Sequence, residues 1–161
     1  MRSRELFIGG YQKIMIEKVC VRNVNYNDFE TLTELIKELG YPSTVSKVSE
    51  RLSKISSSKC YKTFVSEVDG KIVGFIGLCK LYAYEYDGAY IRIIALVVNE
   101  QYRGKGIGTK LVESAEKWAL DEEAIAITLN SGINRKEAHE FYKSKGYDIK
   151  GYSFSKALCK K

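Results

Sequence analysis

The segment from residue 89 to residue 119 constrains the fold of this chain more than any other part of the sequence. Residues 89–98 are almost uninterruptedly apolar, which is typical of a β-strand that is covered on both faces. Glycines follow at positions 104, 106 and 108, and apolar residues then recur at helical spacing up to residue 119. A strand covered on both faces requires helices on both sides of its sheet.

The other elements alternate around this strand–turn–helix unit. Asn27, with Glu30 three residues later, is the expected cap of the first helix, and residues 40–42 (GYP) should end it. Asp69-Gly70 predicts a hairpin turn. The expected order is strand 16–24, helices around 29–39 and 45–55, strands 61–68, 71–81 and 89–98, the glycine-initiated helix, strand 124–129, helix 134–145 and strand 152–158. This order predicts an α/β fold, a single three-layer α/β/α domain with a mixed, largely antiparallel central sheet.

Length and composition support one domain. The chain has 161 residues, 45% of them hydrophobic and 29% charged, which is ordinary for a globular protein with a continuous core. We expect residues 1–14 to be a leader or an extension introduced by cloning, and residues 15–161 to form the domain. No apolar run approaches the roughly 20 residues that span a bilayer, so no membrane partner is expected.

Charge and cysteine content limit the kinds of ligand and partner that we expect for this protein. Lys and Arg number 26 against 20 acidic residues, giving a net charge of +6, which favours an anionic ligand or simply keeps the protein soluble. The basic residues are scattered, so nucleic acid is not an expected partner. The four cysteines and the single histidine have no metal-ligand spacing, which predicts no metal site and reduced thiols in a cytoplasmic protein.

The glycine segment carries the main chemical signal. Unpaired N–H groups and the dipole at a helix start attract phosphate, and glycines allow close approach, while Arg103 and Lys105 add positive charge. The segment has neither the Gly-Lys-Ser/Thr ending of a Walker loop nor GxGxxG spacing. The alternative is a glycine turn that only links a strand to a helix.

The stretch from Leu96 to Gly108 resembles the acetyl-CoA motif of the GNAT superfamily of N-acetyltransferases, through Arg103, Gly106 and Gly108. A second GNAT-like signature follows near the C-terminal end, at Asn134, Ala138, Phe141, Tyr142, Gly146 and Tyr147. The resemblance spans about residues 16–158. It implies the acyl-CoA N-acyltransferase fold, acetyl-CoA as cosubstrate, and acetyl transfer to a primary amine by direct attack in a ternary complex.

The resemblance also implies where acetyl-CoA binds. The backbone of Leu96 and Val98 should pair with the pantetheine arm along an edge that a bulge opens, and residues 103–108 should hold the pyrophosphate. The expected acetyl-CoA-binding residues are Leu96, Val97, Val98, Arg103, Gly104, Lys105, Gly106, Ile107, Gly108, Thr109, Asn130 and Asn134.

Catalysis requires a neutral amine, an oxyanion donor and a proton for the departing thiolate. By the resemblance, Tyr142 donates the proton and a backbone N–H of Val97 or Val98 binds the oxyanion; the alternative is that Tyr142 is an ordinary core ring. Residues 92–95 hold no carboxylate, so the base is either a water chain or unnecessary because the amine arrives neutral. Glu85 is the leading carboxylate for such a chain, with Glu67 and Asp87 as alternatives.

The acceptor is expected to be a small-molecule amine. Residues 134–142 and 152–158 are similar to the aminoalkylphosphonate acetyltransferase branch, which implies an amine bearing an anionic group. Alternatives are a peptide or protein N-acetyltransferase, a non-catalytic acyl-CoA-binding regulatory module, and an interaction protein that uses the tyrosines of residues 82–86. The oligomeric state stays open, with a homodimer as one option.

Overall fold

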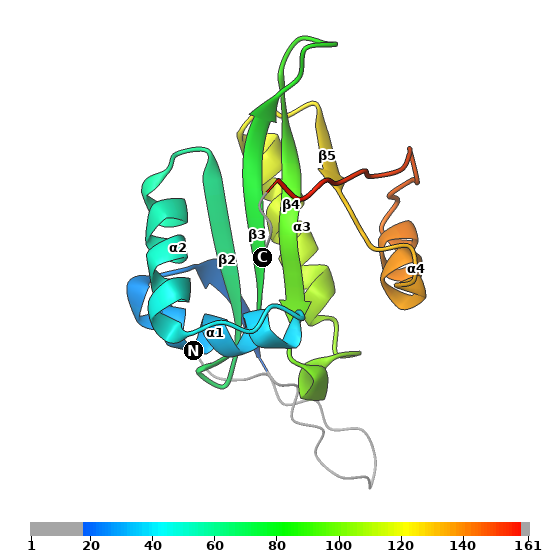
Figure 1. Ribbon diagram of the computed structural model, residues 1–161. Helices are drawn as coiled ribbons and strands as arrows, with labels where there is room; N and C mark the ends of the chain where they lie inside the picture. Colours follow the sequence, from blue (N-terminus) through cyan, green and yellow to red (C-terminus); the bar gives the residue numbers. More distant parts are fainter. Residues whose placement is uncertain (1–17, 159–161) are drawn as a thin grey trace, which may run out of the picture.

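Strand β4 (Ala89–Val98) lies inside the sheet, as its apolar sequence predicts. The computed structural model describes residues 18–158 (Figure 1). The elements besides β4 are β1 (Val19–Asn23), the 3-10 helix η1 (Tyr26–Asp28), α1 (Phe29–Glu38), α2 (Val45–Ser57), β2 (Tyr61–Val68), β3 (Lys71–Tyr82), the 3-10 helix η2 (Glu100–Tyr102), α3 (Ile107–Asp121), β5 (Ala126–Leu129) and α4 (Lys136–Ser144).

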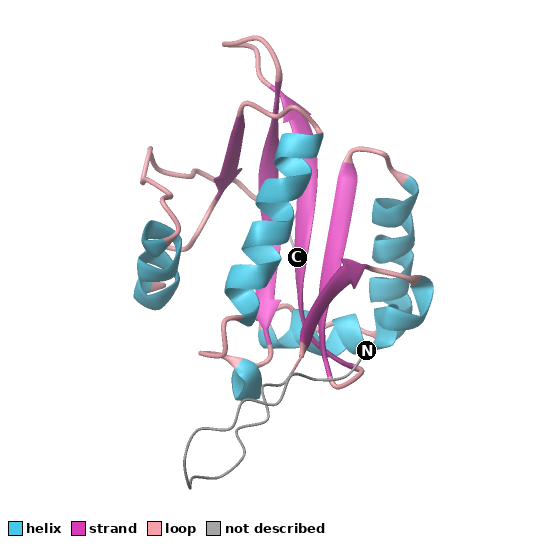
Figure 2. Cartoon of the chain, turned by 180° about the vertical axis from the view of Figure 1, so that it is seen from behind, coloured by secondary structure: helices cyan, strands magenta, loops and turns pink. Residues whose placement is uncertain are grey.

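The sheet follows the chain, in the order β1-β2-β3-β4-β5. The pairs from β1 to β4 are antiparallel, and β4 pairs with β5 in parallel. Helices α1 and α2 cover one face, while α3 covers the other (Figures 1 and 2). The predicted three-layer domain with a mixed, largely antiparallel sheet is confirmed.

Two apolar cores hold the layers together, one on each face of the sheet. Helix α3 packs on residues that include Ile76, Ile91 and Ile93. Helices α1 and α2 pack on residues of the other face, among them Phe75 and Val97. Full burial of a Leu or Ile side chain contributes roughly 1.5–3 kcal/mol, so both helix layers are strongly anchored.

A β-bulge in β4 changes which residues face each core. Leu78 of β3 pairs with Ile93 and Gly77 pairs with Ala95, so Ile94 between them has no partner on β3. Ile93 therefore packs toward α3, whereas Val97 packs toward α1 and α2. Strand β5 pairs only with residues 90–93 of β4, so the edge of β4 beyond the bulge faces no strand of the described sheet.

The predicted cap of the first helix is wrong. Asn25, not Asn27, closes the capping box: its side chain accepts from the amide of Asn27 at 2.9 Å, and its own amide donates to Asp28 at 2.7 Å. The box begins η1, which continues directly into α1. The sequence pattern misplaced it because the short 3-10 turn moves the start two residues upstream.

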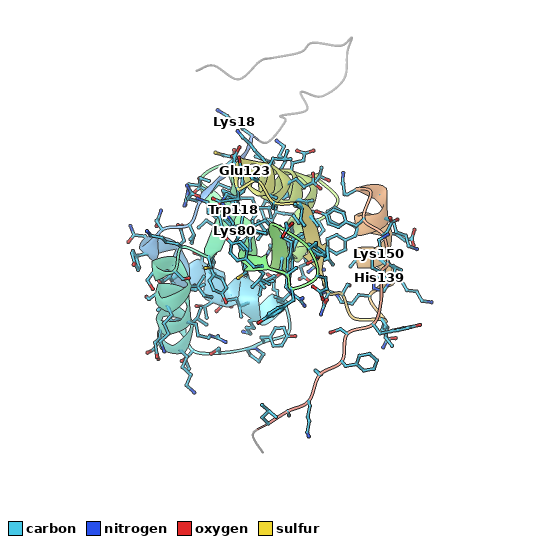
Figure 3. All side chains as sticks on the ribbon, turned by 90° about the horizontal axis from the view of Figure 1, so that it is seen from above. Lys18, Lys80, Trp118, Glu123, His139 and Lys150 are labelled. Carbon is cyan, nitrogen blue, oxygen red and sulfur yellow. The ribbon has the colours of Figure 1, made fainter. Side chains whose placement is uncertain are left out.

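The predicted strand over residues 152–158 is also wrong. These residues form no strand, and Tyr152 and Phe154 are 87% and 93% exposed. Figure 3 shows this tail leading away from the sheet. Its alternating sequence suits a strand, but a strand needs a ladder partner, and none lies beside it within residues 18–158.

The predicted leader, residues 1–14, lies outside the described residues. Across residues 18–158 no helix combines the length and the apolar character that crossing a membrane requires.

Candidate active site

A cleft opens where β4 and β5 diverge beyond the Ile93–Leu129 pair. Its volume is about 610 Å³. Residues 93–98 of β4 form one side and residues 129–132 the other. Further lining residues come from α4 and the residue before it (Arg135, Ala138 and Tyr142), from the end of α1 and the turn after it (Glu38, Leu39 and Tyr41) and from the turn after η2 (Arg103). The bulge at Ile94 creates this cleft, because it releases the second half of β4 from β5.

The free edge of β4 presents unpaired peptide groups to the cleft. The amide of Asn99 donates to the carbonyl of Val73 on β3 at 2.8 Å. In an antiparallel ladder alternate residues point their peptide groups to the same side, so Val97 also points to β3. Leu96 and Val98 therefore point toward the cleft, and the carbonyl of Val98 accepts from Nε of Arg103 at 3.0 Å. The Val97 amide is thus directed away from the position expected of an oxyanion donor.

The glycine segment turns into α3 beside this edge. Gly104 and Gly106 have φ of 76° and 78°, the left-handed region that favours glycine. Gly106 is the N-cap of α3 and has no side chain to cap the helix, so the first-turn amides of residues 107–109 have no acceptor inside the helix. These amides and the helix dipole form a cradle suited to an anion.

The glycines serve two different purposes. A Cβ atom added at Gly104 or Gly106 would meet nothing within 4 Å, so positive φ is what requires glycine there. A Cβ at Gly108 would lie 3.4 Å from Cζ of Phe141, which lies on α4. Gly108 therefore sets the close approach of α3 and α4, a role that the sequence motif did not reveal.

Two basic side chains, those of Arg103 and Lys105, lie next to the cradle, and each contacts another group of the protein. Nζ of Lys105 lies 5.0 Å from the ring centroid of Tyr102, and the Arg103 side chain folds back onto β4. Ile107 is buried in the core beneath the cradle, so only its backbone can contribute to a ligand. Thr109 is partly exposed in the first turn of α3.

Tyr142 lines the cleft from α4. Its ring packs edge-on against Phe141 and Tyr147, with centroids 5.2 and 5.7 Å apart. Burial raises the pKa of the Tyr142 phenol, while nearby Arg135 lowers it. The phenol thus keeps its proton at neutral pH and is able to act as an acid.

The loop after β5 forms the opposite wall. The Ser131 hydroxyl is buried and has no hydrogen-bond partner among residues 18–158. It lines the cleft, which fits a polar ligand at that point. Asn130 also lines the cleft, and its Nδ2 donates to Oγ of Ser153 at 2.8 Å. Asn134 is exposed and is not part of the cleft lining.

The structure separates the predicted base from the cleft. Glu85 and Asp87 are exposed on the β3–β4 loop, at the far end of β4 from the cleft. Glu67 instead accepts from Nη2 of Arg22 at 2.7 Å.

Sequence reasoning missed Glu38, the one carboxylate that lines the cleft among residues 18–158. It accepts from Nδ2 of Asn99 at 2.6 Å and from the amide of Glu100 at 3.2 Å. No local pattern could reveal it, because its partners lie 61 and 62 residues away.

A second hollow, of about 670 Å³, lies around Arg22 of β1, at the opposite edge of the sheet from β5. Its charges are already matched, since Arg22 donates to both oxygens of Asp28, at 2.7 and 2.9 Å, and to Glu67. This network ties β1 to η1 and β2, so we interpret the hollow as structural. For the described part of the chain, no group of three or more His, Cys, Asp or Glu side chains is placed to hold a metal ion.

Comparison with known proteins identifies the class. The sequence profile described as the Acetyltransferase (GNAT) family matches residues 29–147, which is most of the chain. The chain therefore belongs to the GNAT acetyltransferase family. The matched region contains the bulged strand, the glycine cradle and Tyr142, and the family predicted from the two motifs is confirmed.

Among curated proteins, the chain is similar to an aminoalkylphosphonate N-acetyltransferase of Salmonella typhimurium, with 34% identity over 90 residues. That match covers 56% of this chain and 58% of the relative. The chain spans about half the length of the curated relatives it matches. Their naming as N-acetyltransferases agrees with the expected class of enzyme, an acyltransferase.

Solved structures show the same fold. A GNAT family acetyltransferase of Staphylococcus aureus has 34% identity and a TM-score of 0.76, covering 87% of this chain and 98% of that one. An aminoglycoside N-acetyltransferase solved in complex with CoA has a TM-score of 0.79 at 15% identity, covering 89% and 97%. At that identity the likeness concerns the fold alone.

Proposed function

We propose that this protein is an N-acetyltransferase that moves the acetyl group of acetyl-CoA to the primary amine of a small molecule. One observation carries the proposal: the free edge of β4 and the Tyr142 side chain line a single cleft, and Arg103, which also lines it, leads directly into the amide cradle at the start of α3. A strand edge suits an extended amide-containing arm, and the cradle suits its pyrophosphate.

In this proposal the peptide groups of Leu96 and Val98 bind the pantetheine arm, with Val97 between them facing β3. The pyrophosphate lies against Arg103, Gly104, Lys105, Gly106, Ile107, Gly108 and Thr109. Asn130 borders the arm from the opposite wall. Asn134, exposed just before α4, would contact only the outer part of the cosubstrate.

Acetyl transfer then follows from the groups around the cleft. The amine nitrogen attacks the thioester carbonyl carbon, and the oxygen that becomes negative accepts from an N–H on the free edge of β4, at Leu96 or Val98. The carbon–sulfur bond breaks, and the phenol of Tyr142 protonates the departing thiolate. The positively charged nitrogen of the intermediate gives up one proton to solvent, the amide product and free CoA leave, and solvent returns a proton to Tyr142.

No dedicated base is required in this scheme. The Glu38 carboxylate already accepts two hydrogen bonds, and Glu85 lies on the distant β3–β4 loop. We therefore infer that the amine enters in its neutral form. Glu85 could take up a proton from the reaction only through solvent outside the cleft.

A small acceptor is favoured over a peptide, a nucleic acid or a membrane surface. The similar Salmonella protein is named for aminoalkylphosphonates, which are small molecules.

The three cysteines among residues 18–158 are free thiols, which supports a cytoplasmic location.

We also infer a homodimer. The outer edge of β5 pairs with no strand in the described sheet, and Tyr152, Phe154 and Leu158 expose apolar side chains on a strand-like tail. Pairing of this tail with β5 of a second copy would cover both surfaces.

The test is acetyl-CoA turnover with a panel of primary amines, measured as the release of free thiol. We expect thiol release that depends on both the amine and the enzyme, and acetyl-CoA binding by calorimetry. Tight binding without turnover across the panel would favour the non-catalytic acyl-CoA module instead. Absence of binding would reject both functions.

A further inference from the structure

A row of four side chains crosses the sheet just before the bulge in β4. Tyr61 of β2 pairs with Cys79 of β3, Cys79 pairs with Arg92 of β4, and Arg92 pairs with Thr128 of β5. Paired residues on adjacent strands point to the same face, with Cβ atoms roughly 5 Å apart. The row therefore forms a continuous band of mostly polar groups.

This band lies on the face that carries α1 and α2. Ile91 and Ile93 pack into the α3 core, and successive strand residues point to opposite faces, so Arg92 points away from α3. Figure 1 shows α2 beside β2, at the left of the view, and α1 across the lower end of the sheet, with no helix in front of the upper halves of β3 and β4. No helix of residues 18–158 therefore covers this part of the sheet face, which adjoins the cleft at Ile93, Ile94 and Leu129.

Arg92 lacks a partner for its charge. It is half-buried, yet within residues 18–158 it makes no hydrogen bond or ion pair, whereas Arg22 binds two carboxylates and Arg103 binds a carbonyl. Beside Arg92, the Thr128 hydroxyl is buried and has no hydrogen-bond partner either. Native structures seldom leave a buried hydroxyl unmatched, and the half-buried guanidinium of Arg92 stands beside it, so the pair suits a ligand that accepts hydrogen bonds.

The neighbouring row leaves space for that ligand. Between Arg92 and the lower core, Gly77 of β3 pairs with Ala95 of β4, and a Cβ added at Gly77 would meet only the Cβ of Ala95, at 3.9 Å. Ala95 and the bulge residue Ile94 both line the cleft. Arg92 is four residues from Leu96, at most about 13 Å along the strand, a span that the long Arg92 side chain and a short carbon chain can cover together.

We propose that Arg92 and Thr128 form an anion subsite, and that the acceptor is a small primary amine bearing a carboxylate or phosphonate a few carbons from its nitrogen. The guanidinium binds the anion through paired N–H donors and Thr128 donates one more hydrogen bond, which places the amine at the free edge of β4. This assignment rests on the proposed acetyltransferase function.

The first experiment compares 3-aminopropylphosphonate with butylamine, a neutral amine of similar length, in wild type, Arg92→Ala, Arg92→Lys and Thr128→Val. We expect wild type to prefer the phosphonate, and Arg92→Ala to lower the ratio of the two kcat/KM values by about 10- to 100-fold. Arg92→Lys should restore part of the ratio, and Thr128→Val should lower it several-fold. Arg51→Ala, which removes the same charge from the exposed surface of α2, is the matched control.

The second experiment measures binding of propylphosphonate, which has no amine, by calorimetry. We expect binding to wild type and Arg51→Ala, and a loss of at least about 10-fold in Arg92→Ala. Arg92-dependent binding without turnover of any amine would leave the anion subsite standing and reject the acetyltransferase proposal. Turnover of amines with no effect of Arg92→Ala on the ratio or on propylphosphonate binding would do the reverse.

Discussion

The Tyr142 phenol keeps its proton well above neutral pH, because burial raises its pKa. A group that stays protonated can supply a proton to a departing thiolate but cannot act as a base at neutral pH. Its place in the cleft wall and its edge contacts with Phe141 and Tyr147 hold the ring in one orientation. The raised pKa of Tyr142 and the position of its ring in the cleft wall are therefore both consistent with the role of an acid.

Tyr142→Phe removes the proton donor and keeps the ring. We expect kcat to fall by about 100-fold or more, the usual contribution of a positioned acid, with acetyl-CoA affinity within about twofold of wild type. Steady-state thiol release and calorimetry measure the two quantities. An unchanged kcat would mean that Tyr142 only packs the core.

A neutral acceptor amine gives a pH profile of its own. If no protein base acts, kcat/KM should rise with pH in proportion to the neutral fraction of the amine and level off near the amine's own pKa. Two acceptors whose amine pKa values differ by about two units should therefore show profiles shifted by the same amount. A midpoint that is the same for both acceptors would instead indicate a base on the protein.

Gly106 permits a test of the cradle with a matched control. Gly106 has φ of 78° and Gly70, at the β2–β3 turn, has φ of 77°, and a Cβ meets no atom within 4 Å at either position. Alanine at either site should cost roughly 1–2 kcal/mol in the left-handed region. We expect only Gly106→Ala to raise the Kd for acetyl-CoA, by about 10-fold or more in calorimetry. Equal Kd values for both variants would reject the cradle.

At the scale of elements, contacts between distant segments position the cleft. Gly108 lets α4 approach α3, and Glu38 fixes the end of α1 to the turn after β4. The Arg22 network joins β1, η1 and β2 beneath α1. The contacts of Gly108 and Glu38 thus position α4 and the end of α1, which both line the cleft.

The Arg22 network predicts a dependence of stability on pH. Hydrogen bonds from Arg22 lower the pKa of Asp28, aided by the amide of Asn25 and opposed by burial. Because the folded pKa is depressed, this stabilisation is complete above the unfolded value of about 3.9 and is lost as pH falls below it.

We expect Asp28→Asn to lower the free energy of unfolding by about 1–3 kcal/mol at pH 7, and by less at pH 3. Urea unfolding at the two pH values measures the difference. Glu50→Gln, which breaks an exposed pair within α2, is the control and should change little. A difference for Asp28→Asn that is the same at both pH values would contradict the assignment.

At the scale of the whole molecule, the tail and the β5 edge predict assembly. Light scattering after size exclusion should give the mass of two chains, and Phe154→Asp should shift it toward one chain because it places a charge in the proposed contact. Leu120→Asp is the control, since Leu120 is similarly exposed at 76% but lies on α3. A single-chain mass for wild type would exclude the dimer.

Local sequence patterns determined most of the elements. The apolar run over 89–98 and the hairpin over 61–81 gave strands that match those of the structure, because period and turn chemistry act within a few residues. The motifs around Arg103 and Tyr142 marked residues that meet in one cleft. Two predictions were wrong. The cap at Asn27 was misplaced because a 3-10 turn precedes α1, and residues 152–158 form no strand because no ladder partner lies beside them within residues 18–158.

How these elements meet depends on contacts that form only in the folded chain. The bulge at Ile94 depends on pairing with β3, and the approach of Gly108 to Phe141 depends on where α4 lies. Glu38 reaches Asn99 across 61 residues, and Arg92 and Thr128 become neighbours only when β4 pairs with β5. Such contacts join segments far apart in the chain, and no local preference encodes them.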